Sequence, residues 1–144
     1  MKLIISFICA AGLISNVAAQ ELSKSELPSL VLNAFQEEFP KGTDTEWEQE
    51  GDLYKCEFEI GKYEHEVWID KSGNLKKHEE EISKDDLPAA ITQKLKSDFK
   101  DYSIDDVDKV DTDGKTVFRV ELDRNADDRE VLFSPDGSIV QGLN

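Results

Sequence analysis

The sequence predicts an α+β fold made of two tandem repeats, each a helix followed by three or four antiparallel strands. A segment that begins with Leu-Pro and ends with Phe occurs twice, 60 residues apart, with apolar residues at helical spacing. Behind each copy, apolar and charged residues alternate with a period of two, which is typical of a strand with one buried face. We therefore expect repeats over residues 27–82 and 87–142, with both helices packed on one face of antiparallel sheet.

The two halves of the chain also match beyond the Leu-Pro segments. Residues 66–75 align with residues 130–139 at an offset of 64, which implies a four-residue insertion in the second half. A repeat of roughly 55 residues is too small to be stable alone. We expect both repeats to share one core, in a single domain over residues 20–144.

The two expected helices span residues 27–39 and 87–99. Pro28 and Pro88 suit a first helical turn, because the backbone N–H groups there have no acceptor within the helix and proline loses nothing by lacking one. The apolar stripe of the first helix consists of Leu27, Leu30, Val31, Ala34, Phe35 and Phe39. The corresponding stripe of the second helix consists of Leu87, Ala90, Ile91, Leu95 and Phe99.

Strands are expected at residues 54–60, 63–69 and 118–122, because apolar and charged residues alternate there. First strands are expected around residues 45–49 and 104–109, and last strands are expected to begin at Leu75 and Ile139. Gly73 and Gly137 follow Asp-Lys-Ser and Ser-Pro-Asp, so we expect them in tight turns that need a positive φ.

Residues 1–19 have the three parts of a secretory signal peptide. Lys2 supplies the positive charge, residues 3–17 are mainly apolar, and small residues up to Ala19 predict cleavage before Gln20. The apolar stretch is too short and too interrupted for a membrane span, which needs about 20 predominantly apolar residues. We expect a periplasmic or secreted protein that is not attached to a membrane after cleavage.

The mature chain is strongly acidic. The full sequence has 17 basic and 32 acidic residues, and loss of Lys2 with the signal peptide leaves a net charge of −16. Nucleic-acid binding requires a basic surface, so the composition excludes it. Such a charge favours solubility and cationic partners. After cleavage Cys56 is the single cysteine, so no disulfide can form within the chain.

Cys56 could act as a nucleophile with His65 or His78 as its base. However, Cys56 alternates with the charged residues of its strand and aligns with Val120 in the second half, which predicts a buried residue. Cys56, the two histidines and glutamates 79–81 could also be imagined as a metal site, but their spacings match no zinc signature. We predict no catalytic residue, no metal ligand and no cofactor.

Residues 111–114, Asp-Thr-Asp-Gly, resemble part of a calcium-binding loop. The first ligand position of such a loop would fall on Lys109 and the twelfth on Val120, where a glutamate is required. The segment therefore predicts a hairpin turn, and weak calcium association with the acidic surface is left open.

The signal peptide, the two Leu-Pro helices and the strand-turn segment of residues 67–75 resemble the PepSY-like, β-lactamase-inhibitor-like proteins of the bacterial envelope. The resemblance covers nearly all of the mature chain. It implies a periplasmic or secreted domain without enzymatic activity. The family has no shared catalytic motif, so the resemblance transfers no functional residue.

Trp68 and Leu132 are the candidate residues for binding a partner. Trp68 alternates with Val67 and Ile69, so we expect it on the open face of the sheet, where tryptophan often dominates protein interfaces. In the alternative interpretation, Trp68 packs against lysine side chains such as that of Lys55 or is covered by the other repeat.

The preferred hypothesis for function is an exported, non-enzymatic binding module, inhibitor-like, that contacts an envelope or secreted protein partner. One alternative is an acidic cation-binding or structural envelope protein. A less favoured alternative is an enzyme that uses Cys56 and a histidine. The sequence leaves the partner and the oligomeric state open.

Overall fold

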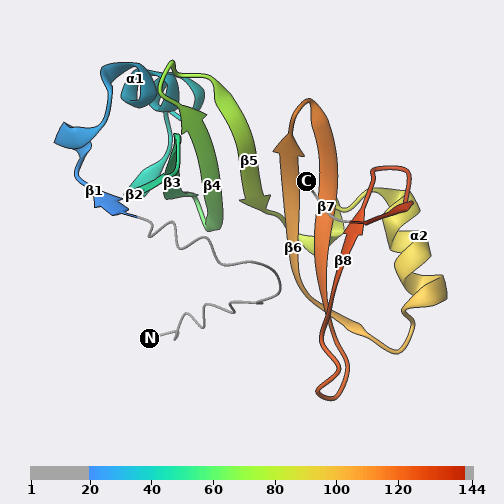
Figure 1. Ribbon diagram of the computed structural model, residues 1–144. Coiled ribbons are helices and arrows are strands. Elements are labelled where there is room, and N and C mark those ends of the chain that lie inside the picture. The colour runs from blue at the N-terminus through green and yellow to red at the C-terminus, as the bar shows by residue number, and fades with distance from the viewer. Residues whose placement is uncertain (1–19, 142–144) are drawn as a thin grey trace.

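The computed structural model describes residues 20–141 and contains one antiparallel sheet of nine strands in the order β1 to β9 (Figure 1). The strands are β1 (Gln20–Leu22), β2 (Thr43–Glu50), β3 (Leu53–Ile60), β4 (Tyr63–Asp70), β5 (Leu75–Glu81), β6 (Ser103–Thr112), β7 (Lys115–Asp123), β8 (Arg129–Phe133) and β9 (Ile139–Val140). The α-helices are α1 (Ser29–Glu38) and α2 (Ala89–Asp98). Short 3-10 turns, Lys24–Glu26 and Lys84–Asp86, precede them.

The predicted fold class, an α+β fold of two tandem helix-and-sheet repeats with helices packed on one face, is wrong. β5 pairs directly with β6, from Lys77 opposite Thr112 to Glu81 opposite Asp108, so all strands form one sheet. Each α-helix has ten residues and is about 15 Å long, whereas nine strands are about 38 Å across. The helices lie near opposite ends of the sheet and form no continuous layer (Figure 1).

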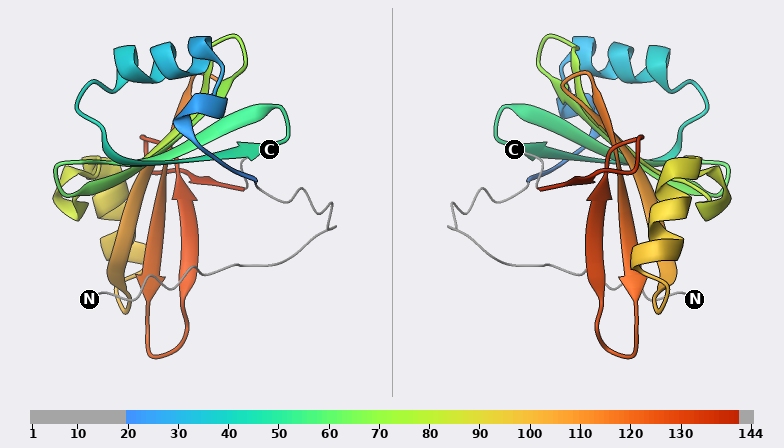
Figure 2. Two further views of the ribbon diagram at one scale, coloured as in Figure 1. Left: turned by 90° about the vertical axis from the view of Figure 1, so that its left-hand side faces the viewer. Right: turned by 90° about the vertical axis from the view of Figure 1, so that its right-hand side faces the viewer.

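The strand directions turn progressively across the sheet. The two side views show β2–β4 crossing β6–β8 at a large angle (Figure 2). Such a turn is expected, because each strand in a sheet is rotated by roughly 20–25° from its neighbour. The twist gives the sheet a strongly curved surface.

Two tight turns bring β-hairpins against the helices. Gly73 and Gly137 have φ values of 86° and 85°, as their sequence context predicts. A Cβ atom at Gly73 would lie 2.9 Å from the carbonyl oxygen of Leu30, and one at Gly137 would lie 2.9 Å from that of Ala90. Both positions therefore need glycine for its backbone conformation and for its small size.

Apolar side chains on one face of the sheet, here called the core face, form two clusters. The first combines α1 with β2–β4: Leu27, Val31, Phe35, Phe39, Trp47, Cys56, Phe58, Val67 and Ile69. The second combines α2 with β6–β8: Leu87, Ile91, Leu95, Val107, Phe118, Val120, Leu122 and Phe133. Because the hydrophobic stabilisation rises with buried apolar area, these clusters are the main source of stability.

The predicted signal peptide, residues 1–19, lies outside the described residues, and β1 begins at Gln20. Among residues 20–141, no helix is long and apolar enough to cross a membrane.

Candidate functional site

The face of the sheet opposite the core face carries a row of glutamates. Strand register places Glu46, Glu57, Glu66 and Glu79 next to one another across β2, β3, β4 and β5. Each alternates along its strand with a residue of the core face, which fixes its direction. Because neighbouring strands are about 4.8 Å apart, the four carboxylates lie close to one another. We call this surface the acidic face.

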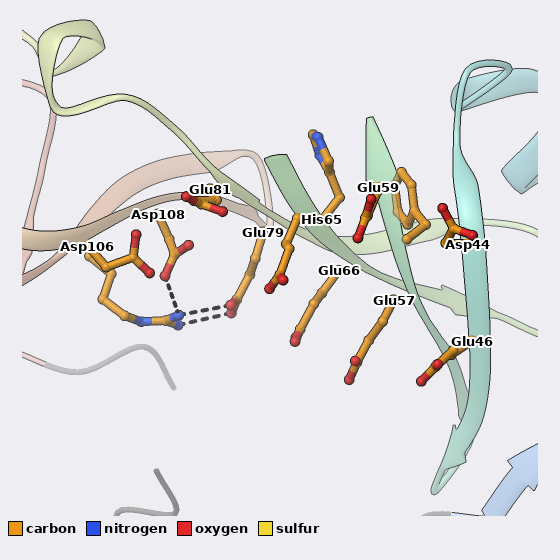
Figure 3. Close-up of a pocket in the computed structure, with 13 residues that line it drawn as sticks. Asp44, Glu46, Glu57, Glu59, His65, Glu66, Glu79, Glu81, Asp106 and Asp108 are labelled. Atoms are coloured by element: carbon orange, nitrogen blue, oxygen red, sulfur yellow. Dashed lines mark hydrogen bonds and ion pairs between the residues drawn. The ribbon is translucent and has the colours of Figure 1, made fainter. Parts of the chain in front are cut away.

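The acidic face surrounds a cavity of about 380 Å³ (Figure 3). Ten of its thirteen lining residues are acidic: Asp44, Glu46, Glu57, Glu59, Glu64, Glu66, Glu79, Glu81, Asp106 and Asp108. The remaining three are Phe58, His65 and Arg119. In Figure 3 the side chains of Glu46, Glu57 and Glu66 extend in nearly the same direction. The cavity is therefore a strongly negative surface with a single arginine at one end.

Arg119 on β7 connects several of these carboxylates. Its Nη1 and Nη2 donate to the two carboxylate oxygens of Glu79 at 2.9 and 3.0 Å, and Nη1 also donates to Asp108 at 3.3 Å. Its Nε lies 3.7 Å from Glu130. At the other side, Lys55 Nζ lies 2.7 Å from Glu57 and 3.3 Å from Glu66. These two cations offset only part of the negative charge.

Crowding of carboxylates shifts their pKa values. Burial, followed by repulsion from Asp106, raises the pKa of Asp108 to about 6 despite the attraction of Arg119. Burial also raises the pKa of Glu66. Burial acts in the same direction on Glu79, but hydrogen bonds from Arg119 and Lys77 outweigh it and hold the pKa of that carboxyl below its usual value. The face therefore carries uncompensated negative charge that an added cation would stabilise.

Trp68 lies on the acidic face, as its alternation predicts, but it is not open to solvent. Only 9% of it is exposed. Its Nε1 donates to Glu50 at 2.9 Å, and Nζ of Lys77 and Lys55 lie 4.3 and 5.4 Å from a ring centroid. Lysine side chains therefore cover the indole, as in the alternative interpretation of this residue.

Leu132 is half-buried on β8, opposite Arg119 in the register. Three strands separate β8 from β4, which corresponds to a distance of about 19 Å from the strand of Trp68. The two candidate residues therefore do not form one contact patch.

Cys56 is completely buried in the first core cluster. Burial raises the pKa of its thiol to about 12, so the reactive thiolate is not populated at neutral pH. In the register Val67 stands between Cys56 and His78. This arrangement is that of a structural cysteine, and it does not support the Cys-His enzyme.

Residues 111–114 comprise the end of β6 and the β6–β7 hairpin turn at Asp113 and Gly114, whose φ values are 50° and 73°. The hairpin interpretation of this segment is confirmed.

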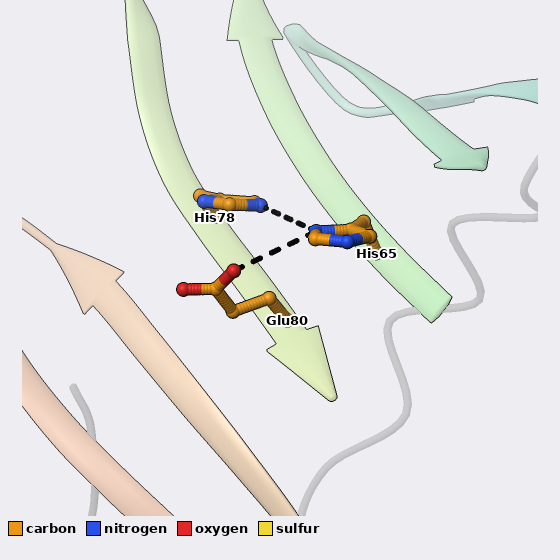
Figure 4. Close-up of side chains that lie close together, drawn as sticks. All are labelled: His65, His78 and Glu80. Atoms are coloured by element: carbon orange, nitrogen blue, oxygen red, sulfur yellow. Dashed lines mark hydrogen bonds and ion pairs between the residues drawn. The ribbon is translucent and has the colours of Figure 1, made fainter. Parts of the chain in front are cut away.

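A second polar cluster lies on the core face between β4 and β5 (Figure 4). His65 Nδ1 is 3.2 Å from His78 Nε2 and 3.9 Å from a carboxylate oxygen of Glu80. Burial lowers the pKa of both imidazoles, so both are neutral at neutral pH. These residues belong to the set considered above for a metal site, but their spacing in the sequence did not predict the grouping, because it depends on the register of two strands.

The sequence profile of the family described as "Putative beta-lactamase-inhibitor-like, PepSY-like" matches residues 15–77 and residues 52–141. The chain belongs to this PepSY-like family. The resemblance stated from the sequence is thereby confirmed.

Solved structures from Bacteroides share the fold of this PepSY-like protein. One is a BLIP-like protein from Bacteroides fragilis, with a TM-score of 0.68 and 24% identity over 80% of this chain and 84% of that chain. Another, described as putative periplasmic proteins from Bacteroides eggerthii, has a TM-score of 0.72 and 19% identity over 80% and 86%. A DUF2874 family protein from Bacteroides uniformis has a TM-score of 0.71 and 18% identity over 79% and 86%. A comparison with curated proteins gives no match.

Proposed function

We propose that this protein is an exported, non-enzymatic binding module whose acidic face docks a basic segment of an envelope or secreted protein. The observation that carries the proposal is the cavity on the acidic face, where ten of thirteen lining residues are acidic and Arg119 is the one arginine. The inhibitor-like description of the family supports a protein as the partner. The predicted signal peptide and the periplasmic description of the Bacteroides eggerthii protein support export.

Charge complementarity selects a basic segment as the occupant. Burial, with repulsion from neighbouring carboxylates as a lesser cause, raises the pKa values of Asp108 and Glu66, and lysine or arginine side chains entering the cavity would stabilise their charged forms. The net charge of the chain adds long-range attraction, which accelerates encounter with a cationic partner. Binding should therefore release a proton from Asp108 near and below about pH 6, and it should weaken as the solution becomes more acidic.

Neutralising two glutamates of the row is expected to weaken binding of a basic peptide at least tenfold. The probe is a synthetic peptide in which lysine and arginine alternate with apolar residues, and its affinity is measured by titration calorimetry. Glu57→Gln with Glu66→Gln removes two charges beside the cavity. The matched control, Glu37→Gln with Glu38→Gln, removes two charges from exposed positions of α1 and should leave the affinity nearly unchanged.

Salt separates the proposed contact from apolar binding. The affinity should fall steeply between low and physiological ionic strength, because screening acts on the exposed charges. Equal losses in the two double variants would mean that net charge alone attracts the peptide, which contradicts a defined docking face. Saturable calcium binding without any peptide binding would instead favour the acidic cation-binding alternative.

A further inference from the structure

We propose that His65, His78 and Glu80 form a binding site for a divalent transition-metal ion such as zinc. The three side chains place one ligand atom each within 4.8 Å of one another. They come from β4 and β5, where His65 stands opposite Glu80 in the register (Figure 4). The side chains belong to the core face, although His65 also borders the acidic cavity. The proposal rests on these three residues and not on the proposed docking.

The separation of the two imidazole nitrogens is close to that of a tetrahedral site, and the carboxylate lies somewhat further away. Zinc bonds of 2.0–2.1 Å to imidazole nitrogen and carboxylate oxygen set ligand atoms about 3.3–3.4 Å apart. The separation between His65 Nδ1 and His78 Nε2 is 3.2 Å. Glu80 Oε2 lies 3.9 Å from His65 Nδ1, and the three ligand atoms lie within 4.8 Å of one another, so the carboxylate needs to move by up to about 1.5 Å to reach that separation from both imidazoles.

The two imidazole rings are held in place by aromatic neighbours. His65 stacks on Phe58 with ring centroids 5.1 Å apart, and only 8% of its side chain is exposed. His78 lies 4.9 Å from the ring of Phe39. Because the rings are already fixed, a metal ion has less conformational entropy cost to offset when it binds them.

The carboxylate of Glu80 is also oriented. Its Oε1 accepts a hydrogen bond from Lys109 Nζ at 3.0 Å, and its Oε2 faces His65. Such outer contacts orient metal ligands in many sites. Glu80 and His78 are half-buried, so the cluster has a path to solvent.

A ligand set of two imidazoles and one carboxylate favours a transition-metal ion over calcium. Imidazole suits zinc and copper, whereas calcium takes oxygen ligands, so calcium should not compete. One imidazole donates a hydrogen bond to the other between His65 Nδ1 and His78 Nε2, and metal binding requires the donor ring to carry its proton on its other nitrogen. Three protein ligands leave a fourth position for water.

Zinc binding is the test, measured by competition with a chromogenic chelator. The protein should bind one zinc ion at this site, and His78→Gln or Glu80→Gln should weaken it at least tenfold, because even outer-shell changes cost about 10–100-fold. Glu81→Gln is the matched control. It removes the same charge from the neighbouring position of β5, whose side chain offers no ligand atom to the cluster and acts on His65 only through its charge, so it should weaken the affinity far less than either ligand variant.

Imidazole NMR signals supply a second readout. Zinc should shift the ring nitrogen resonances of both histidines, while a cooperative thermal melt of His78→Gln shows that the variant is folded. Equal zinc affinity in wild type, His78→Gln and Glu80→Gln would overturn the proposal. Zinc binding that leaves both imidazoles unperturbed would overturn it as well, since the ion would then lie on the acidic face.

Discussion

Replacing Arg119 with leucine is expected to lower the free energy of unfolding by about 3–5 kcal/mol. Arg119 is 21% exposed, and its guanidinium pairs with Glu79 through two hydrogen bonds and with Asp108 through a third. Leucine would leave Asp108 without its cation, and Glu79 with Lys77 alone, in a partly buried position. The loss should be smaller at high salt, because screening reduces the repulsion that remains. Chemical denaturation at low and high salt measures both effects.

Arg124 provides the matched control for that variant. Its side chain is 39% exposed and pairs with Asp127, so Arg124→Leu should change the stability by no more than about 1 kcal/mol. Arg119→Lys should give a loss of stability between those two values, since an ammonium group keeps the charge but cannot form the bidentate contact with the carboxylate. Similar stability losses in Arg119→Leu and Arg124→Leu would show that the arginine network contributes little.

Replacing Trp68 with alanine is expected to cost about 3–5 kcal/mol of stability. The indole is nearly covered by Lys77, Lys55 and the carboxylate of Glu50. Removal of the ring leaves a cavity on the acidic face and exposes the lysine stems that it contacts. Thermal unfolding followed by circular dichroism gives the change.

Two further variants separate the causes of that loss. Trp68→Phe keeps an aromatic ring under the lysines but loses the N–H donor to Glu50, so it should cost only about 1–2 kcal/mol. Leu30→Ala removes a side chain that is 56% exposed and should change the stability by about 0.5 kcal/mol or less. A Trp68→Ala protein as stable as Leu30→Ala would contradict the covered position of the indole.

The positions of the elements could be predicted from the sequence, but their assembly could not. The alternation around Cys56 and Phe58 predicts β3, and the Leu-Pro segments predict helices close to α1 and α2. The pairing of β5 with β6 joins residues separated by a whole helix. Periodicity carries no information about such long-range pairing, so the prediction of two helix-and-sheet repeats was wrong.

The same limit explains which parts of the site were missed. Glutamates are so frequent in this chain that no pair of them stands out in the sequence. Only the register places Glu57 beside Glu66 and Glu66 beside Glu79. Trp68 was assigned to the correct face from its alternation, but the side chains that cover it belong to neighbouring strands, and a single strand cannot reveal them.

NMR mapping of the basic peptide on the isotopically labelled protein tests the proposed docking face most directly. The largest chemical-shift changes should occur at the backbone amides of those β2–β5 residues whose side chains lie on the acidic face, including Glu57, Glu66 and Glu79. A control peptide with glutamate in place of its basic residues should cause none. Changes centred on Leu132 and Ile139, or spread evenly over exposed acids such as Glu37, would contradict the account.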